Sequence, residues 1–452
     1  MNPILLVVIP LIAAFLSILI KKYAHILLLL TSLAVTIMSL FVTQGITNIG
    51  GDTPIYSIYF VVSSYTELSL LVVNGLLLFI YATNYVKFQK FSPVLLVILA
   101  GLNGLLLTAD LFNLFVFMEI VAIAGYIITA TQNAPSKTFS YLVQGSIGST
   151  FYLLGLIILY NMTGTLSMHD VASQIQASNA SVSIPVLMMV IGLGVEIKIL
   201  PLNNWVKGIL ETSNTLTGPL IASAYSATFL FVFTRVIQYI YIPSSTLTTI
   251  LLVIFVVSIV AGEAMAYDSK RVKHILLFSS IAQSGIVALL AIYGFVGVAA
   301  VFISVVAVTK FILFAITNHI EEQTQTDDIE KLEGIFKQNI LLGVFFTVAV
   351  LSMLGLPLFV GFIVKMNAIM SLFETGQYVI PVAILLTTII EAIYLIKLLG
   401  VLWYGQNDVK IKLCPALYVI LGILVISLIV FGLTSNVSDL IDKINLIDWM
   451  EV

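Results

Sequence analysis

Long apolar runs with almost no charge dominate this chain of 452 residues and constrain its fold more than any other feature. Several of them reach the roughly twenty residues that an α-helix needs to cross the hydrocarbon core of a bilayer. Hydrophobic residues make up 60% of the sequence and charged residues 9%, whereas a soluble domain carries about a quarter charged residues. Because lipid offers the backbone no hydrogen-bond partners, only helices or a closed barrel can span it, and runs without two-residue alternation indicate helices. We therefore predict an all-α polytopic membrane protein.

Proline, glycine and charge clusters divide the apolar runs into fourteen expected transmembrane helices. They cover residues 3–20, 24–43, 57–81, 91–109, 111–132, 138–160, 184–206, 216–241, 247–266, 273–294, 297–319, 338–362, 377–402 and 413–434. The first run follows no basic segment and has no clear cleavage site, so we expect a retained helix rather than a signal peptide. The tail from Ser435 to Val452, with Trp449 and Met450, is expected to lie in the membrane interface.

The basic residues give an independent test of this division, because loops retained in the cytoplasm collect Lys and Arg. Thirteen of the 19 basic residues fall in loops that follow odd-numbered helices, and the loops after even-numbered helices have none. The thirteen are Lys21, Lys22, Lys87, Lys90, Lys137, Lys207, Lys270, Arg271, Lys273, Lys331, Lys337, Lys410 and Lys412. The asymmetry predicts a multi-pass protein of the cell (inner or plasma) membrane with both termini on the outer face.

Two expected helices carry a proline well inside, Pro201 in the seventh and Pro357 in the twelfth, each beside glycines and a lysine. Kinked helices are common in membranes, but breaks at corresponding places in two halves are typical of repeated transporter folds. We expect two inverted five-helix repeats, with helices 7 and 12 broken. The expected parts are 1–90 with helices 1–3, 91–241 with helices 4–8, 247–402 with helices 9–13, and 413–452 with the last helix and the tail.

Ionisable side chains inside the expected helices carry the functional signal, because each costs about 2.5–3.5 kcal/mol at the bilayer centre on insertion scales. The candidate relay residues are Glu119, Glu196, Lys198, Lys310, Lys365 and Glu391, and Glu67, Arg235, Glu263 and Lys397 form a second tier. Desolvation drives Lys and Glu toward their neutral forms, and proximity of the two restores both charges. A row of such lysines and glutamates through the membrane predicts a path for protons or Na⁺. The alternative is static salt bridges or side chains that reach to the interface, which we favour for Glu263 and Lys397.

Other chemistries lack the residues that they need. Cys414 is the only cysteine, which excludes an internal disulfide and a cysteine-held iron–sulfur cluster. No His, Cys or carboxylate group stands at metal-binding spacing, and no phosphate loop or nucleophile elbow is present. We therefore expect no cofactor, no metal and no redox chemistry in this chain. A net charge of −3 without a long basic tract does not indicate nucleic acid as a partner.

Four stretches resemble the antiporter-like family shared by Mrp-type Na⁺/H⁺ antiporters, the membrane arm of respiratory complex I and group 4 membrane-bound hydrogenases. They are Asp110–Glu119, Tyr160–Met168, Asp268–Arg271 with Ser279–Gly285, and Gly355–Lys365. The second is most similar to the Mrp D-type branch. The resemblance implies that Glu119 is the input carboxylate, a helix-seven lysine its partner, Lys310 the central relay and Lys365 the exit-side group.

The sequence departs from the family pattern in its first half. Glu196 stands where the helix-seven lysine is usual, and Lys198 is displaced by two residues. Ala227 or Thr228 occupies the region of a common helix-eight lysine. Phe302 and Val306 replace histidines that often precede the helix-eleven lysine. The first half-channel is therefore either rewired or kept for a structural role alone.

Taken together, these features predict a proton- or Na⁺-translocating, antiporter-like subunit of a multisubunit membrane complex. Its expected partners are other membrane subunits and the lipid bilayer. Two alternatives stay open: an autonomous secondary cation/proton antiporter, and a scaffold subunit with a vestigial path. The sequence does not distinguish protons from sodium, nor one parent complex from another.

Overall fold

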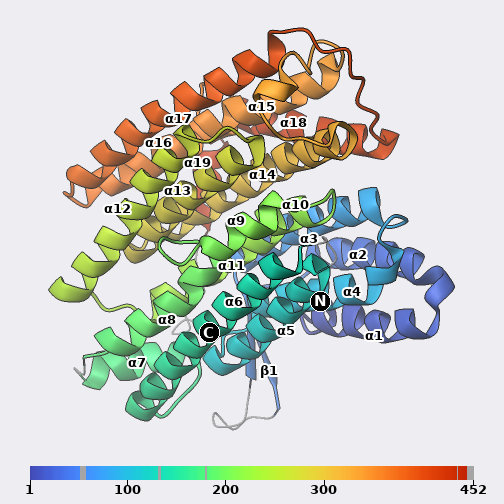
Figure 1. Cartoon of the computed structure of the whole chain (residues 1–452). Coiled ribbons are helices and arrows are strands. Elements are labelled where there is room, and N and C mark those ends of the chain that lie inside the picture. The colour runs from blue at the N-terminus through green and yellow to red at the C-terminus, as the bar shows by residue number, and fades with distance from the viewer. Residues whose placement is uncertain (51–57, 131–133, 179–180, 435, 445–452) are drawn as a thin grey trace. The chain divides into compact units, whose positions relative to one another are not determined.

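A computed structural model describes residues 1–50, 58–130, 134–178, 181–434 and 436–444 of the chain. These residues are almost entirely helical (Figure 1). The helices are α1 (Leu5–Leu19), α2 (Ala24–Ser39), α3 (Ser64–Asn84), α4 (Ser92–Leu107), α5 (Leu111–Thr129), α6 (Pro135–Thr163), α7 (Met168–Ser178), α8 (Ser183–Glu196), α9 (Asn204–Glu211), α10 (Thr217–Pro219), α11 (Ser226–Ile240), α12 (Ser245–Tyr267), α13 (Val272–Ile292), α14 (Val296–Thr324), α15 (Ile340–Leu354), α16 (Val360–Glu374), α17 (Val379–Trp403), α18 (Pro415–Leu433) and α19 (Asn436–Lys443). Two strands, β1 (Gly45–Ile49) and β2 (Ile58–Val62), pair in antiparallel register.

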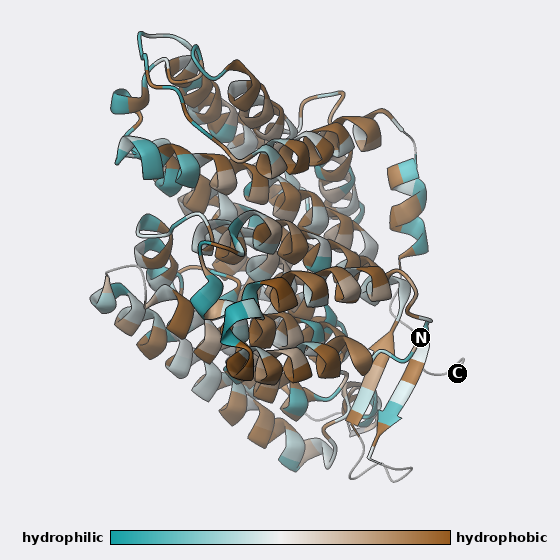
Figure 2. Ribbon diagram, turned by 90° about the vertical axis from the view of Figure 1, so that its right-hand side faces the viewer, coloured by the Kyte–Doolittle hydropathy of each residue, from teal (hydrophilic) through white to brown (hydrophobic). Residues whose placement is uncertain are grey.

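Most of these helices suit a bilayer. In the described part of the chain, eleven are long and apolar enough to cross a membrane, and α1, α8 and α15 are shorter apolar helices. Figure 2 shows apolar residues along the long helices and polar residues gathered in loops and short helices. Many large apolar side chains remain exposed on the helices, as a surface in contact with lipid requires.

The third expected helix, 57–81, begins too early. Residue 57 lies outside the described residues, Ile58–Val62 forms strand β2, and α3 starts only at Ser64. β-Branched and aromatic residues favour a strand once a neighbouring strand is available, and β1 supplies it. Ser63 then fixes the start of α3, because its hydroxyl accepts a hydrogen bond from the Thr66 N–H at 3.2 Å.

The two proline-containing helices are interrupted. The seventh, expected over 184–206, consists of α8 and α9 with residues 197–203 between them, and this gap includes Pro201. The twelfth, expected over 338–362, stops at the end of α15 and resumes as α16. Pro357 lies in that second gap, and α16 continues to Glu374, well beyond the expected end. The short helices α7 and α19 were not expected, and Trp449 and Met450 lie outside the described residues.

The chain divides into two compact units. The first contains Met1–Lys198, Thr228–Val253 and the described part of Lys443–Val452. Within it, α4 packs against α1, α2, α3 and α5, and α6 packs along α8. Glycines permit the close approach of the last two helices, because a Cβ at Gly192 would lie 2.7 Å from the Gly148 carbonyl oxygen.

The second unit contains Ile199–Ala227 and Ile254–Asp442. Its centre is α14, which packs against α13, α15, α16 and α10. In Figure 1, α13 and α14 run side by side. Because α14 is surrounded by other helices, Lys310 near its middle is 0% exposed and meets protein groups rather than lipid.

Candidate functional site

The broken helix of the second unit holds a buried ion pair. Lys365 of α16 pairs through its Nζ atom with Glu391 of α17, and the Nζ atom lies 3.4 Å from the carbonyl oxygen of Leu354, the last residue of α15. Glycines shape this site. Gly355 adopts a left-handed conformation with φ 78°, and a Cβ at Gly361 would lie only 1.7 Å from the Ser352 carbonyl oxygen. The interruption between α15 and α16 therefore leaves the Leu354 carbonyl oxygen available to Lys365, whose other partner is the Glu391 carboxylate.

A second carboxylate lies close to this pair. Glu391 and Tyr394 are three residues apart on α17 and so share a face of the helix. The Tyr394 hydroxyl donates a hydrogen bond of 2.8 Å to Oε2 of Glu263 on α12. Glu263 in turn interacts electrostatically with Glu391, Lys365 and Lys310. Two acidic and two basic side chains are thus gathered from four helices.

Lys310 is linked to the same group through hydroxyls. Its Nζ atom donates to the Leu276 carbonyl oxygen at 2.8 Å and to Ser279 Oγ at 2.5 Å, both on α13. The Ser279 hydroxyl donates to the Leu276 carbonyl oxygen at 3.0 Å and lies near the Tyr394 hydroxyl. We define the second-unit relay as three contacting pairs of side chains that interact with one another electrostatically: Lys310 with Ser279, Tyr394 with Glu263, and Glu391 with Lys365.

The second-unit relay has the properties of a proton path. Serine and tyrosine hydroxyls both donate and accept hydrogen bonds, so they can pass a proton between neighbours. Two adjacent carboxylates disfavour simultaneous ionisation, and each nearby ammonium favours it. A proton gained by one carboxylate therefore changes the charge balance of the whole cluster.

A small cavity adjoins Lys365. Its volume is about 20 Å³, and Gln283, Ser352, Gly361 and Lys365 are among the residues that line it. The buried atoms Gln283 Oε1 and Ser352 Oγ have no hydrogen-bond partner in the described structure. The cavity has room for about one water molecule, which these two polar groups are suited to hold.

The first unit arranges its charges more loosely. Glu119 lies half-buried in the middle of α5 and forms no ion pair within the described residues. Tyr126, two turns further along α5, interacts electrostatically with both Glu119 and Glu196. Its hydroxyl packs against α6, where a Cβ at Gly145 would lie 2.1 Å away. Tyr126 thus lies within electrostatic reach of both Glu119 and Glu196.

Glu196 and Lys198 meet where α8 ends. Glu196 is the last residue of the helix, and Lys198 has a left-handed backbone with φ 67°. Two residues so spaced would point to different sides of a continuous helix, but here they interact electrostatically, and Lys198 is 1% exposed. A non-glycine residue with positive φ stores backbone strain, which is frequent at functional sites.

The remaining intramembrane charges have separate environments. The Arg235 guanidinium donates to the carbonyl oxygens of Leu105 and Leu106 at the end of α4. This arrangement caps that helix. Glu67 accepts a hydrogen bond from Gln44 at 3.0 Å. Among the described residues, no three His, Cys, Asp or Glu side chains come together to hold a metal ion.

A comparison with protein families identifies the architecture. Residues 108–391 match the family described as "NADH:quinone oxidoreductase/Mrp antiporter, TM", and this match covers more than half of the chain. The chain belongs to this family. The prediction of an antiporter-like family from the four sequence stretches is therefore confirmed, as is that of a multi-pass, all-α membrane protein.

Individual members of the antiporter-like family show how similar the chain is. It is 28% identical over 345 residues to NADH-quinone oxidoreductase subunit N of Desulforudis audaxviator, covering 72% of this chain and 68% of that protein. It is 24% identical over 431 residues to a Na(+)/H(+) antiporter subunit of Bacillus subtilis, covering 89% of this chain and 87% of that protein.

Solved structures of other membrane complexes contain chains with the same fold. A chain of the membrane-bound sulfane sulfur reductase, an archaeal respiratory membrane complex, matches with a TM-score of 0.91 and 26% identity, covering 98% of this chain and 96% of that chain. A chain of the Mrp complex from a Dietzia species matches with a TM-score of 0.86 and 18% identity, with the same coverage. Both neighbours are parts of multisubunit membrane complexes.

Sequence reasoning missed three hydroxyl groups in these sites: those of Tyr126, Ser279 and Tyr394. Signals for two of them were present. Tyr394 is three residues after Glu391, and Ser279 opens one of the stretches that carry the family resemblance. The hydroxyls were overlooked because they carry no charge, and only the packed helices reveal what they join.

Proposed function

We propose that this chain translocates protons or Na⁺ as the antiporter-like subunit of a multisubunit membrane complex. The second-unit relay carries this proposal, because three contacting pairs of lysines, carboxylates and hydroxyls that interact electrostatically inside a membrane can form a path for charge. The relatives named as belonging to a quinone oxidoreductase and to an antiporter support it. In this proposal the chain holds no redox group of its own. Redox chemistry in a partner subunit, or exchange of one ion for another, supplies the free energy for translocation.

The proposed cycle depends on Lys365. Its ammonium lies between the Glu391 carboxylate and the Leu354 carbonyl oxygen. When Glu391 binds a proton, it loses its charge and releases the lysine toward the carbonyl group. The electrostatic coupling of Glu263 to Lys310 then transmits the change along the relay. In the first unit, Glu119 and the Glu196–Lys198 pair take the input role.

The proposal includes the finer topology. The eleven long helices and the three shorter ones together correspond to fourteen spans. The interruptions at Pro201 and Pro357 support two inverted repeats, with helices 4–8 in residues 91–241 and helices 9–13 in residues 247–402. The lysine-rich loops support an orientation with both termini on the outer face of the cell membrane.

The test is ion translocation by the complex purified with its partners and reconstituted in liposomes. Lys310→Ala and Glu119→Gln should each abolish it, because each removes a titratable group from the path. Exposed Lys337 lies in a loop, so Lys337→Ala is the matched control and should translocate normally. Measuring proton and Na⁺ uptake in parallel identifies the ion. Unchanged pumping by both relay variants would contradict the proposal.

Two other functions give different results in the same assays. An autonomous antiporter would transport ions in liposomes that contain this chain alone. A scaffold subunit with a vestigial path would support wild-type pumping with Glu119, Lys198 and Lys310 all neutralised. Subunits that copurify with the chain would identify the parent complex.

A further inference from the structure

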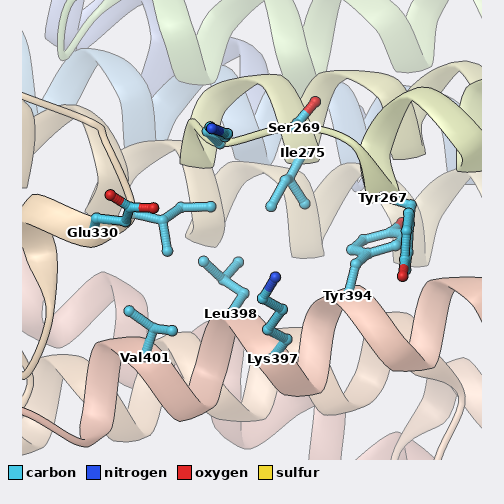
Figure 3. Close-up of a pocket in the computed structure, with 10 residues that line it drawn as sticks. Tyr267, Ser269, Ile275, Glu330, Tyr394, Lys397, Leu398 and Val401 are labelled. Atoms are coloured by element: carbon cyan, nitrogen blue, oxygen red, sulfur yellow. The ribbon is translucent and has the colours of Figure 1, made fainter.

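A cavity at the end of the second unit leads toward the second-unit relay. Its volume is about 150 Å³, enough for several water molecules. Figure 3 shows Glu330 and Val401 toward one end of this cavity and Tyr267 and Tyr394 toward the other, with Lys397 reaching from α17 into the space between them. The cavity lies beside the loop with Lys270, among the lysine-rich loops of the chain.

The wall beside this loop is held in place by backbone hydrogen bonds. The Ile329 N–H donates to the Lys270 carbonyl oxygen at 3.0 Å, and the Val272 N–H donates to the Asp327 carbonyl oxygen at 2.9 Å. Exposed side chains, including Lys270 and Glu330, line the cavity here. The cavity is therefore a preformed feature with a polar opening.

One face of α17 forms the opposite wall. Tyr394, Lys397, Leu398 and Val401 all line the cavity, at the spacing of neighbouring turns on one side of a helix. The first of them is the tyrosine that donates its hydroxyl hydrogen to Glu263. Tyr394 is 3% exposed, so it separates the cavity from the buried carboxylates. The same side chain thus belongs to the cavity wall and to the second-unit relay.

We propose that this cavity is a water-filled inlet through which protons from the lysine-rich side reach the second-unit relay, with Tyr394 as the group that passes them to Glu263. This inference rests on the proposed function and adds a second entry point for protons to it, in addition to the input residues of the first unit. The hydroxyl of Tyr394 gives its proton to Glu263 Oε2 and accepts one from a cavity water. The tyrosine ends neutral, Glu263 ends protonated, and the water file has lost one proton to the carboxylate.

The inlet selects protons over Na⁺. Among the charged residues that line it, the amines of Lys270 and Lys397 outnumber the single carboxylate of Glu330. The ammonium groups repel positive charge of either kind, so the feature that favours a proton over a sodium ion here is transfer by exchange along hydrogen bonds. The tyrosine hydroxyl can hand on a proton and cannot hand on a metal ion. The ion that moves at this point of the relay is therefore a proton.

Cysteine labelling tests whether the cavity is open to water. Cys414 is the only cysteine, so Cys414→Ser provides a clean background. In membrane vesicles that expose the lysine-rich loops, Val401→Cys and Lys397→Cys should react with a charged thiol reagent at least about tenfold faster than Ile396→Cys, because only a thiol in contact with water ionises readily. Ile396 is the matched control, since it is exposed on the same helix but does not line the cavity. Equal rates at all three positions would overturn the inlet.

Translocation by the reconstituted complex tests whether protons use the inlet. Tyr394→Phe removes the connecting hydroxyl and should slow proton uptake at least about tenfold, with the ring packing kept. Val401→Trp should obstruct the cavity and slow it similarly, while Ile396→Trp should not. The slow variants should still assemble with their partners and show a larger solvent deuterium isotope effect than the wild type, which a purely structural defect would not produce.

The outcomes separate this inference from the function on which it rests. If Lys310→Ala abolishes translocation while Tyr394→Phe and Val401→Trp pump normally, the inlet is wrong and the proposed function stands. If Lys310→Ala also pumps normally, the proposed function is wrong and the inlet falls with it. A Na⁺ flux that Val401→Trp blocks would contradict the exclusion of sodium from the inlet.

Discussion

The two interrupted helices each bring a lysine and a glutamate together, but they do so in different ways. In the first unit, Lys198 lies in the break itself and interacts with Glu196 of the same segment. In the second, Lys365 lies within α16 and pairs with Glu391 of a different helix. Two charged residues of one segment can stay close together when that segment moves. An ion pair between two helices is weakened when one helix moves relative to the other. The second break is therefore the better placed to couple helix movement to charge.

The largest expected effect separates the two pairs. Lys365→Ala leaves Glu391 as a buried carboxylate without its partner, which should destabilise the protein by about 3–5 kcal/mol and abolish translocation. Lys198→Gly should cost less, because glycine adopts the left-handed backbone at this position without strain and so offsets part of the lost interaction. Thermal unfolding of the purified complex measures both.

A double variant provides the control for the larger effect. Lys365→Met combined with Glu391→Leu removes both charges and should restore much of the lost stability, because replacing a whole buried pair with apolar residues is often neutral. It should not restore translocation. Recovered pumping would mean that the pair is structural, and the contrast between the two units would lose its functional meaning.

The next prediction concerns the backbone around the second break. Gly361→Ala places a Cβ 1.7 Å from the Ser352 carbonyl oxygen, so α16 must move away from α15. We expect a loss of about 1–3 kcal/mol from this overpacking, and reduced translocation because Lys365 moves with α16. Gly422→Ala is the matched control, since its Cβ would meet only Phe345 at an ordinary 3.7 Å. Equal stability of the two variants would show that the break tolerates displacement.

The helices of this fold were largely predictable, because burial in lipid demands apolar runs of a fixed length and leaves charges in the loops. Strand β2 was not predictable, because Ile58–Val62 is as apolar as the segments that form transmembrane helices. Its pairing with Gly45–Ile49 cannot be recognised from the local sequence. Whether this segment forms a strand or a helix depends on strand β1, which lies too far away in the sequence to affect a local helix prediction.

The candidate site was predictable as a set of residues but not as a set of contacts. The composition of the helices identified Lys310, Lys365 and Glu391. Nothing in the spacing indicated that Glu391 would meet Lys365, 26 residues earlier in the chain, because such pairs depend on how whole helices pack. The static role expected for Glu263 stays a prediction, and the structure adds its hydrogen bond from Tyr394, which the sequence did not indicate.

A smaller effect is expected from the buried arginine of the first unit. Arg235→Lys keeps the charge but cannot reproduce two hydrogen bonds from one planar group to Leu105 and Leu106, so we expect a loss of about 1.5–3 kcal/mol. Translocation per assembled complex should stay at the wild-type rate, because the guanidinium caps α4 rather than carrying charge. Lost translocation in a fully assembled complex would instead make Arg235 part of the path.

The smallest expected effect compares the tyrosines of the two units. Tyr126 interacts only electrostatically with Glu119 and Glu196, whereas Tyr394 donates a direct hydrogen bond to Glu263. Tyr126→Phe should therefore slow translocation by no more than the worth of one ordinary hydrogen bond, about 1 kcal/mol or roughly fivefold. Side-by-side rates for Tyr126→Phe and Tyr394→Phe measure the difference. If Tyr126→Phe proves slower than Tyr394→Phe, Glu119 and Glu196 depend on a tyrosine hydroxyl at least as much as Glu263 does. Both units would then use a tyrosine beside their carboxylates to move charge.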